Sequence, residues 1–270
     1  MPLKKVTKRV HICVIGDVGT GKSALVTSFC TNRSPTRNTS SSSKTEATEP
    51  FRKPAKTVAM DYAAKRIPND EETRSSTSSK QYHQIEVCVT DFSGSDLYQD
   101  ARYATYDSVG RDVDGFLLVC SKRSAEISFE TIETKWFEEI KRADSRRKAT
   151  RVPSCVCICI HDTENKIENK INEIDGARFS TKDEGNDRSH SLLRERFERL
   201  LELRDSDRLR NGPEPASTEV HADDADDGRT KSFVCEANAK TSKGVQEMFV
   251  RLAKNALARR ERTHRPCSRN

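Results

Sequence analysis

A glycine-rich run near the N-terminus has the residue types and spacing needed to bind a polyphosphate. It reads GDVGTGKS and fits the pattern G-x-x-x-x-G-K-[ST], between an apolar stretch and a helical one. The glycines let backbone N–H groups turn toward a phosphate, and the N-terminus of the following helix adds positive partial charge. Lys22 would reach the β- and γ-phosphates, and the hydroxyl oxygen of Ser23 would ligate Mg²⁺. The run predicts a nucleoside triphosphate site, with phosphate-binding residues Gly16, Asp17, Val18, Gly19, Thr20, Gly21, Lys22, Ser23 and Ala24.

Three further segments indicate the class of nucleotide-binding protein. They are KTVAMDY from Lys56 to Tyr62, DFSG from Asp91 to Gly94, and FVCEANAKT from Phe233 to Thr241, which is followed by GVQEMF. In order and context these segments resemble the nucleotide-binding motifs of the Ras superfamily of small GTPases, most closely those of its Rab branch. The resemblance covers the chain outside its polar insertions.

The resemblance implies a role for each matched residue. Thr57 would bind Mg²⁺ and sense the γ-phosphate, so that the surrounding segment is ordered only in the triphosphate state. Asp91 would hold Mg²⁺ through a water molecule, and the N–H of Gly94 would contact the γ-phosphate. Ala239 would contact the guanine base and Lys240 would flank it.

The family's guanine-binding pattern N-K-x-D has no clean counterpart here. His161-Asp162-Thr163-Glu164 directly follows an apolar strand, and Glu164 could accept hydrogen bonds from guanine N1 and N2. Asn165-Lys166-Ile167-Glu168 is closer to the pattern but lies four residues further along. We take Glu164 as the expected guanine ligand, with the second segment, or polar loop residues without a guanine contact, as open alternatives.

Two other departures bear on hydrolysis. The family usually has Gln after D-x-x-G to orient the attacking water, whereas this chain has the shorter Ser95. Val18 would crowd the γ-phosphate. We therefore expect a GTP-binding molecular switch of Ras/Rab type with Mg²⁺ as cofactor, slow hydrolysis of GTP to GDP, and an effector protein as partner. One alternative is a hydrolysis-deficient nucleotide-binding scaffold. Another is a P-loop kinase, against which the A-N-A-K strand end argues.

The rest of the sequence alternates strand-like and helix-like stretches. Strands are predicted at 10–15, 57–67, 84–90, 115–120, 153–160 and 231–235, and helices at 23–31, 126–142, 192–201 and 245–258. This alternation predicts an α/β protein with the three-layer P-loop NTPase fold and a mostly parallel six-stranded sheet. Cys155, Cys157 and Cys159 lie on one face of a predicted strand, and we expect buried hydrophobic side chains there instead of metal ligands.

The composition indicates a folded domain that carries polar insertions. Hydrophobic residues make up 33% of the 270 residues and charged residues another 33%, whereas a typical globular domain is about 45–50% apolar with glycine included. Polar segments bury too little apolar surface to offset the entropy of ordering them. We therefore expect a domain over residues 10–258 between basic tails at 1–9 and 259–270, with insertions at 33–56, 68–80, 144–152, 161–190 and 205–230.

Composition also bears on location and partners. No apolar run approaches the roughly 18 residues of a membrane span, and the N-terminus lacks the pattern of a secretory leader. Nine cysteines without such a leader indicate a reducing compartment, and we expect a cytoplasmic protein. The basic C-terminal tail would attract acidic membrane surfaces only weakly, and Cys267 lacks the aliphatic residues that prenylation requires. A net charge of +6 with few aromatic residues does not indicate nucleic-acid binding.

Overall fold

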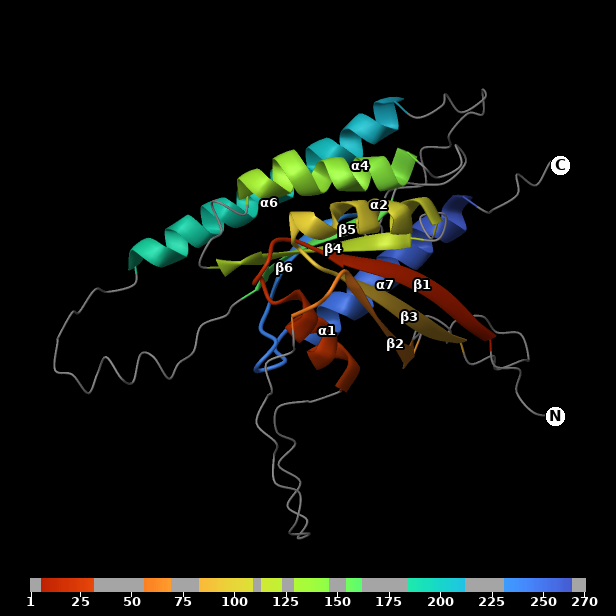
Figure 1. The fold of residues 1–270 in the computed structure, drawn as a ribbon. Coiled ribbons are helices and arrows are strands. Elements are labelled where there is room, and N and C mark those ends of the chain that lie inside the picture. The colour runs from red at the N-terminus through yellow and green to blue at the C-terminus, as the bar shows by residue number, and fades with distance from the viewer. Residues whose placement is uncertain are drawn as a thin grey trace, which may run out of the picture.

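The computed structural model contains a six-stranded sheet with the strand order β2-β3-β1-β4-β5-β6 (Figure 1). Only β2 runs antiparallel, against β3. The strands are β1 (Val6–Ile15), β2 (Met60–Pro68), β3 (His83–Phe92), β4 (Val113–Ser121), β5 (Cys155–His161) and β6 (Phe233–Ala237). The structure describes residues 6–31, 56–68, 83–108, 113–122, 129–145, 154–161, 184–211 and 231–263.

Helices cover both faces of this sheet. α1 (Lys22–Thr31) and α7 (Val245–Thr263) pack on one face, over a core that includes Val10, Ile12 and Val14 of β1. α2 (Gln99–Ser108), α4 (Phe137–Ser145) and α6 (Glu184–Asn211) lie on the other face (Figure 1). Alternate residues of each strand point to opposite faces, and Cys13 and Ile15 accordingly belong to the second core. The predicted α/β class and mostly parallel six-stranded sheet are confirmed.

Several elements differ from the sequence prediction. α2 and the 3₁₀ turn before it (Asp96–Tyr98) were not predicted, because the buried positions of α2 include Arg102 and Thr105 and leave a weak apolar pattern. α6 extends into the predicted insertions at 161–190 and 205–230, α4 reaches Ser145, and β5 includes His161. Residues 57–59 precede β2 instead of belonging to it. The other parts of the five predicted insertions, apart from residues 56 and 68, lie outside the described residues.

Both predicted basic tails overlap regular elements. β1 starts at Val6, and Lys8 lies 2.6 Å from Glu261 of α7. α7 continues to Thr263, and Arg259 and Arg260 pair with Asp205 and Asp114 at 3.0 and 3.2 Å. These basic side chains therefore form ion pairs within the fold. Cys267 lies outside the described residues.

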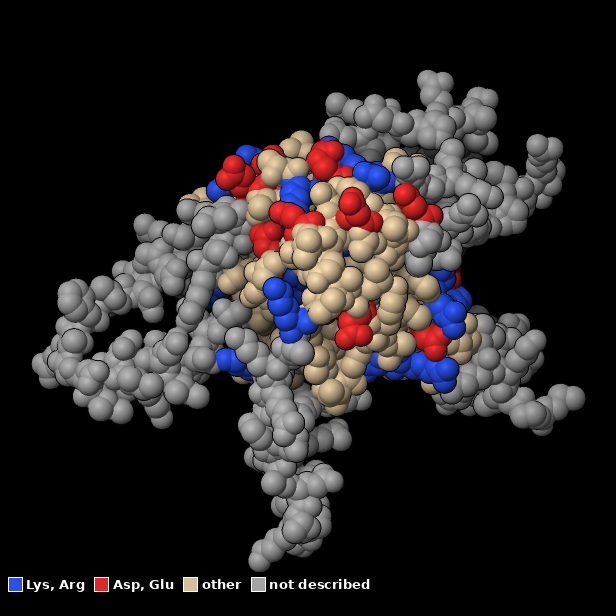
Figure 2. Space-filling model, viewed as in Figure 1, with Lys and Arg blue, Asp and Glu red and all other residues tan. Residues whose placement is uncertain are grey.

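Charged side chains of both signs surround an uncharged centre on the face of the molecule shown in Figure 2. Neither sign gathers into a single large patch on that face. Among the described residues, no helix combines the length and apolar character that crossing a bilayer requires.

Candidate functional site

The glycine-rich run forms the bend between β1 and α1. Gly16, Gly19 and Gly21 have φ values of +139°, +81° and +91°, which other residues rarely adopt. A Cβ on Gly16 would lie 2.3 Å from the carbonyl oxygen of Val119 in β4. The backbone path of this bend therefore depends on its glycines, as the motif predicted.

Lys22, the first residue of α1, folds back across this bend. Its Nζ donates hydrogen bonds to the carbonyl oxygens of Gly16 at 2.8 Å and Asp17 at 2.7 Å. The side chain is only 6% exposed, and this burial lowers its pKa to about 8. The ammonium group is thus held inside the loop by two carbonyl oxygens, where a polyanion would compensate its charge far better.

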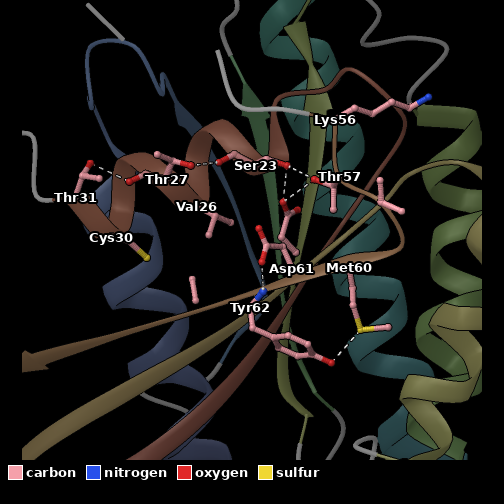
Figure 3. A pocket seen from close by; sticks show the side chains of 13 residues that line it. Ser23, Val26, Thr27, Cys30, Thr31, Lys56, Thr57, Met60, Asp61 and Tyr62 are labelled. Carbon is pink, nitrogen blue, oxygen red and sulfur yellow. Dashed lines mark hydrogen bonds between the residues drawn. The ribbon is translucent and has the colours of Figure 1, made fainter. Parts of the chain in front are cut away.

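Ser23, Thr57 and Asp91 meet beside the loop (Figure 3). The hydroxyl oxygens of Ser23 and Thr57 are 2.8 Å apart, and both hydroxyl groups contact Oδ2 of Asp91, that of Thr57 at 3.3 Å. The other carboxylate oxygen of Asp91 is buried and has no hydrogen-bond partner among the described residues. Burial raises the pKa of this carboxyl group. Three residues far apart in the sequence therefore bring oxygen atoms to one point.

The donor set of this cluster fits Mg²⁺. Mg²⁺ prefers hard oxygen ligands and usually keeps several waters, so that one or two carboxylates suffice. The buried, unpartnered oxygen of Asp91 is the kind of atom that a bound cation or its water would satisfy. No group of three or more His, Cys, Asp and Glu side chains suited to a metal occurs in the part of the chain that the structure describes, so this cluster depends on its two hydroxyl groups.

The cluster lies at one end of a cavity of about 390 Å³ between α1 and β2 (Figure 3). Val26 and Cys30 of α1 line one side and Met60 and Tyr62 of β2 the other. Val58 and Tyr62 are 70% and 64% exposed, and Leu97 in the turn after β3 is 83% exposed. Apolar side chains are therefore exposed close to the oxygen cluster.

Gly94 places the segment after β3 directly against the glycine-rich bend. A Cβ at this position would lie 2.3 Å from the carbonyl oxygen of Gly16 and 2.6 Å from the amide nitrogen of Val18. The N–H of the preceding Ser93 donates to the carbonyl of Ala59, at 2.9 Å, so the segment also contacts the residues before β2. Three of the predicted motifs are thereby packed together. Val18 lies on the outside of the bend, with 59% of its surface exposed.

The side chain of Asp17 points away from the interior of the bend. Its carboxylate accepts hydrogen bonds from Thr131 Oγ1 at 2.9 Å and from the indole N–H of Trp136 at 3.0 Å. Both partners belong to the helical segment before α4, which has a π-helical turn at Ile132–Trp136. A π-helical turn often marks a functional position. Any role of Asp17 in binding phosphate therefore falls to its backbone. The sequence offered no sign of this contact.

A buried arginine, which the sequence did not indicate, holds the segment around Gly94. Arg102 of α2 forms two hydrogen bonds to the carboxylate of Glu139 in α4, at 3.0 and 2.8 Å. Its remaining Nη1 donates to the carbonyl oxygens of Ser93 and Ser95, both at 2.9 Å. The Arg102 and Glu139 side chains are 0% and 1% exposed. The backbone of Ser95, where the family carries Gln, is thus fixed to two helices.

His161, at the end of β5, connects the bend to the segment after β6. Its Nδ1 lies 3.0 Å from the carbonyl oxygen of Thr20, and its Nε2 lies 3.3 Å from the amide nitrogen of Ala239. A carbonyl accepts and an amide donates, so these partners assign the proton to Nδ1. The ring lies close against Gly21, where an added Cβ would be 2.4 Å away. The predicted guanine segment is therefore joined to the predicted phosphate loop.

Of the other predicted base-binding residues, the structure describes Ala239 and Lys240 only. Ala239 is 2% exposed and lies beside His161, while Lys240 is exposed and its N–H donates to Asn238 Oδ1 at 2.9 Å. Glu164 and the alternative segment Asn165-Lys166-Ile167-Glu168 lie outside the described residues. Of the predicted base site, the structure describes the loop after β6 and the ring of His161.

We expect His161→Ala to destabilise the protein by about 1–3 kcal/mol, because the buried carbonyl of Thr20 and N–H of Ala239 lose their partner. Urea unfolding without added nucleotide measures this loss. His161→Asn is the matched control, since its amide can both donate and accept a hydrogen bond. It should lower the free energy of unfolding clearly less than His161→Ala does. Equal stability of His161→Ala and the wild type would show that this connection is dispensable.

Comparison with known proteins adds no identification. No family model matches the chain, and no curated protein matches its sequence.

Proposed function

We propose that this chain is a small GTPase of the Ras/Rab type that binds GTP or GDP with Mg²⁺ and acts as a molecular switch with slow intrinsic hydrolysis. One observation carries the proposal: Lys22 lies inside a glycine-rich bend, directly beside the oxygen cluster of Ser23, Thr57 and Asp91. A buried ammonium beside hard oxygen donors suits a polyphosphate with its cation. The sequence resemblance supports guanine as the base.

Each residue would have a distinct task. Lys22 and the amides of the bend would neutralise and hold the phosphates, and Gly94, packed on the bend, would direct its N–H to the γ-phosphate. Ser23 and Thr57 would hold Mg²⁺ directly and Asp91 through a water. When bound, Mg²⁺ neutralises charge that develops on the phosphate oxygens. Contact of Thr57 with the cation would couple the γ-phosphate to the segment before β2, which is the basis of switching.

The effector protein would contact the apolar side chains beside this segment. Val58 and Tyr62, which line the same cavity as Thr57, supply exposed apolar surface, and their position would change with the state of the nucleotide. We further propose a cytoplasmic location with at most weak contact to an acidic membrane surface.

The identity of the bound nucleotide tests the proposal. The protein is purified in buffer containing Mg²⁺, denatured, and its released nucleotide identified by chromatography. GTP or GDP in near-stoichiometric amount supports the proposal. ATP, or no nucleotide together with no binding of added GTP, overturns it.

A hydrolysis-deficient binding module is a second candidate. Ser95 lacks the reach of Gln, and Arg102 fixes its carbonyl oxygen. Such a protein would keep its triphosphate for long periods and present one fixed surface to its partner.

We expect single-turnover hydrolysis of GTP by the wild type to be slower than about 10⁻⁴ per second, the intrinsic scale of a small GTPase with its glutamine. Ser95→Gln should raise the rate about tenfold or more, because its amide can orient the attacking water. Ser145→Gln, at the exposed end of α4, is the control and should leave the rate unchanged. A wild-type rate at or above the family's scale would exclude the second candidate.

A further inference from the structure

Three cysteines form a thiol cluster between β5 and β6, away from the proposed nucleotide contacts. Cys159 and Cys235 are register partners on these parallel strands, and the sulfur atoms of Cys157 and Cys235 lie 3.4 Å apart. Cys157 and Cys159 have no exposed surface, whereas Cys235 is partly exposed. Of these three residues, Cys235 is therefore the one with surface that a small reagent can reach.

The surroundings of the three thiols are unequal. Hydrogen bonds from Cys157 and Cys159 lower the pKa of Cys235, and the positive charges of Arg251 and Arg194 act in the same direction. Burial raises the pKa of Cys157, whose sulfur lies within hydrogen-bonding distance of the Cys235 sulfur. Reactive cysteines are partly exposed thiols in electropositive surroundings. Cys235 has both properties.

This combination is absent from the described cysteines Cys30, Cys120 and Cys155. Burial raises the pKa of Cys155 to about 11 and that of Cys120 to about 12, and neither is exposed. Cys30 is partly exposed, but burial raises its pKa as well. It therefore provides a comparison at similar accessibility.

We propose that Cys235 is a site of oxidation by hydroperoxides and that Cys157 is its resolving thiol. The Cys235 thiolate attacks the outer oxygen of the peroxide, forming Cys235–SOH and releasing hydroxide, or an alkoxide when the hydroperoxide is organic. The released base takes the proton of the Cys157 thiol, and the resulting thiolate attacks the sulfenic sulfur, which forms a Cys157–Cys235 disulfide and releases hydroxide. The peroxide is reduced and the two thiols are oxidised, with no further reactant.

This bond requires β6 to shift along β5, because Cys157 pairs with Phe233 and lies two residues from the register partner of Cys235. A disulfide needs its sulfur atoms about 2.05 Å apart, so the present separation of 3.4 Å must close. β6 is the last strand of the sheet and pairs only with β5 among the described strands, so it can shift without disturbing a second neighbour. The bond would join the strands that lead into His161 and Ala239.

Peptide mapping by mass spectrometry under non-reducing conditions tests the proposal. The full chain is reduced, desalted, treated with hydrogen peroxide for increasing times and then alkylated. We expect a Cys157–Cys235 linkage that dithiothreitol reverses, and loss of free Cys235 at least about tenfold faster than loss of free Cys30. Equal rates for Cys235 and Cys30, or a linkage that excludes Cys235, would overturn the proposal.

Two variants separate the steps. Cys157→Ala should leave Cys235–SOH unresolved, so that a dimedone adduct accumulates on Cys235. Cys30→Ala is the matched control and should preserve the Cys157–Cys235 linkage. A disulfide between Cys159 and Cys235 in the wild type would contradict the role of Cys157. Because the wild-type map alone can refute the proposal, the test does not depend on the folding of any variant or on nucleotide binding.

Discussion

Lys22→Ala is expected to weaken nucleotide binding by about 30- to 5,000-fold, which corresponds to roughly 2–5 kcal/mol for removing one partner of a buried charge interaction. The ammonium group is held within the bend by the carbonyl oxygens of Gly16 and Asp17 and is almost fully buried. Its removal leaves the phosphates with the backbone amides and the proposed Mg²⁺ only. Equilibrium titration with a fluorescent GTP analogue in Mg²⁺ buffer measures the change.

The pH dependence of nucleotide affinity provides a second test of the role of Lys22. Burial lowers the Lys22 pKa from 10.5 to about 8, and a bound polyphosphate favours the charged form and raises it again. Below pH 8 the lysine is charged in both states, so affinity should not depend on its titration. Above about pH 8 binding must take up a proton, and affinity should fall by up to about tenfold per pH unit. Lys22→Ala should remove this part of the pH dependence.

Lys141→Ala provides the matched control. This lysine forms an exposed pair with Glu138 on α4, so its loss changes the net charge equally without touching the bend. Its affinity for the analogue should equal that of the wild type. Unchanged affinity in Lys22→Ala would overturn the proposed nucleotide site altogether.

The central strands of this fold could be predicted because apolar residues dominate them. β4 and β5 are almost entirely buried, and their continuous apolar runs are typical of central parallel strands. α2 could not be found in this way, since its buried face carries Arg102, whose partner lies 37 residues away. The length of α6 also escaped prediction, because the ends of this helix have the polar composition of a loop.

The site residues show the same distinction between features with a local sequence pattern and features without one. The glycine-rich bend is contiguous in the sequence, so that its residue types alone indicate its chemistry. Thr57 and Asp91 were expected beside Ser23 only because the ordered motifs resemble a family. The contact between Asp17 and Trp136 joins residues 119 positions apart and has no local pattern. His161 was recognised as a departure from the guanine motif, but the two backbone contacts of its ring required the structure.

Glu139→Leu is expected to lower the free energy of unfolding by about 3–5 kcal/mol, because it leaves the Arg102 guanidinium buried without its counter-charge. Both side chains are inaccessible to water, and each carboxylate oxygen of Glu139 accepts a bond from Arg102. Urea unfolding followed by the fluorescence of Trp136, the only tryptophan of the chain, measures the loss. Glu138→Leu on the same helix is the control, since its exposed pair with Lys141 should contribute less than about 1 kcal/mol.

The double variant Arg102→Leu/Glu139→Leu separates the ion pair from the other bonds of Arg102. Removing both charges ends the penalty of an unpaired buried ion, so the double variant should be more stable than Glu139→Leu. It should remain less stable than the wild type by about 1–3 kcal/mol, because the carbonyl oxygens of Ser93 and Ser95 lose their donor. Full recovery of wild-type stability would show that Arg102 contributes only by neutralising the charge of Glu139. Incomplete recovery means that the pair also supports its neighbours, through the bonds of Arg102 to Ser93 and Ser95 and the bond of the Tyr106 hydroxyl to Glu139.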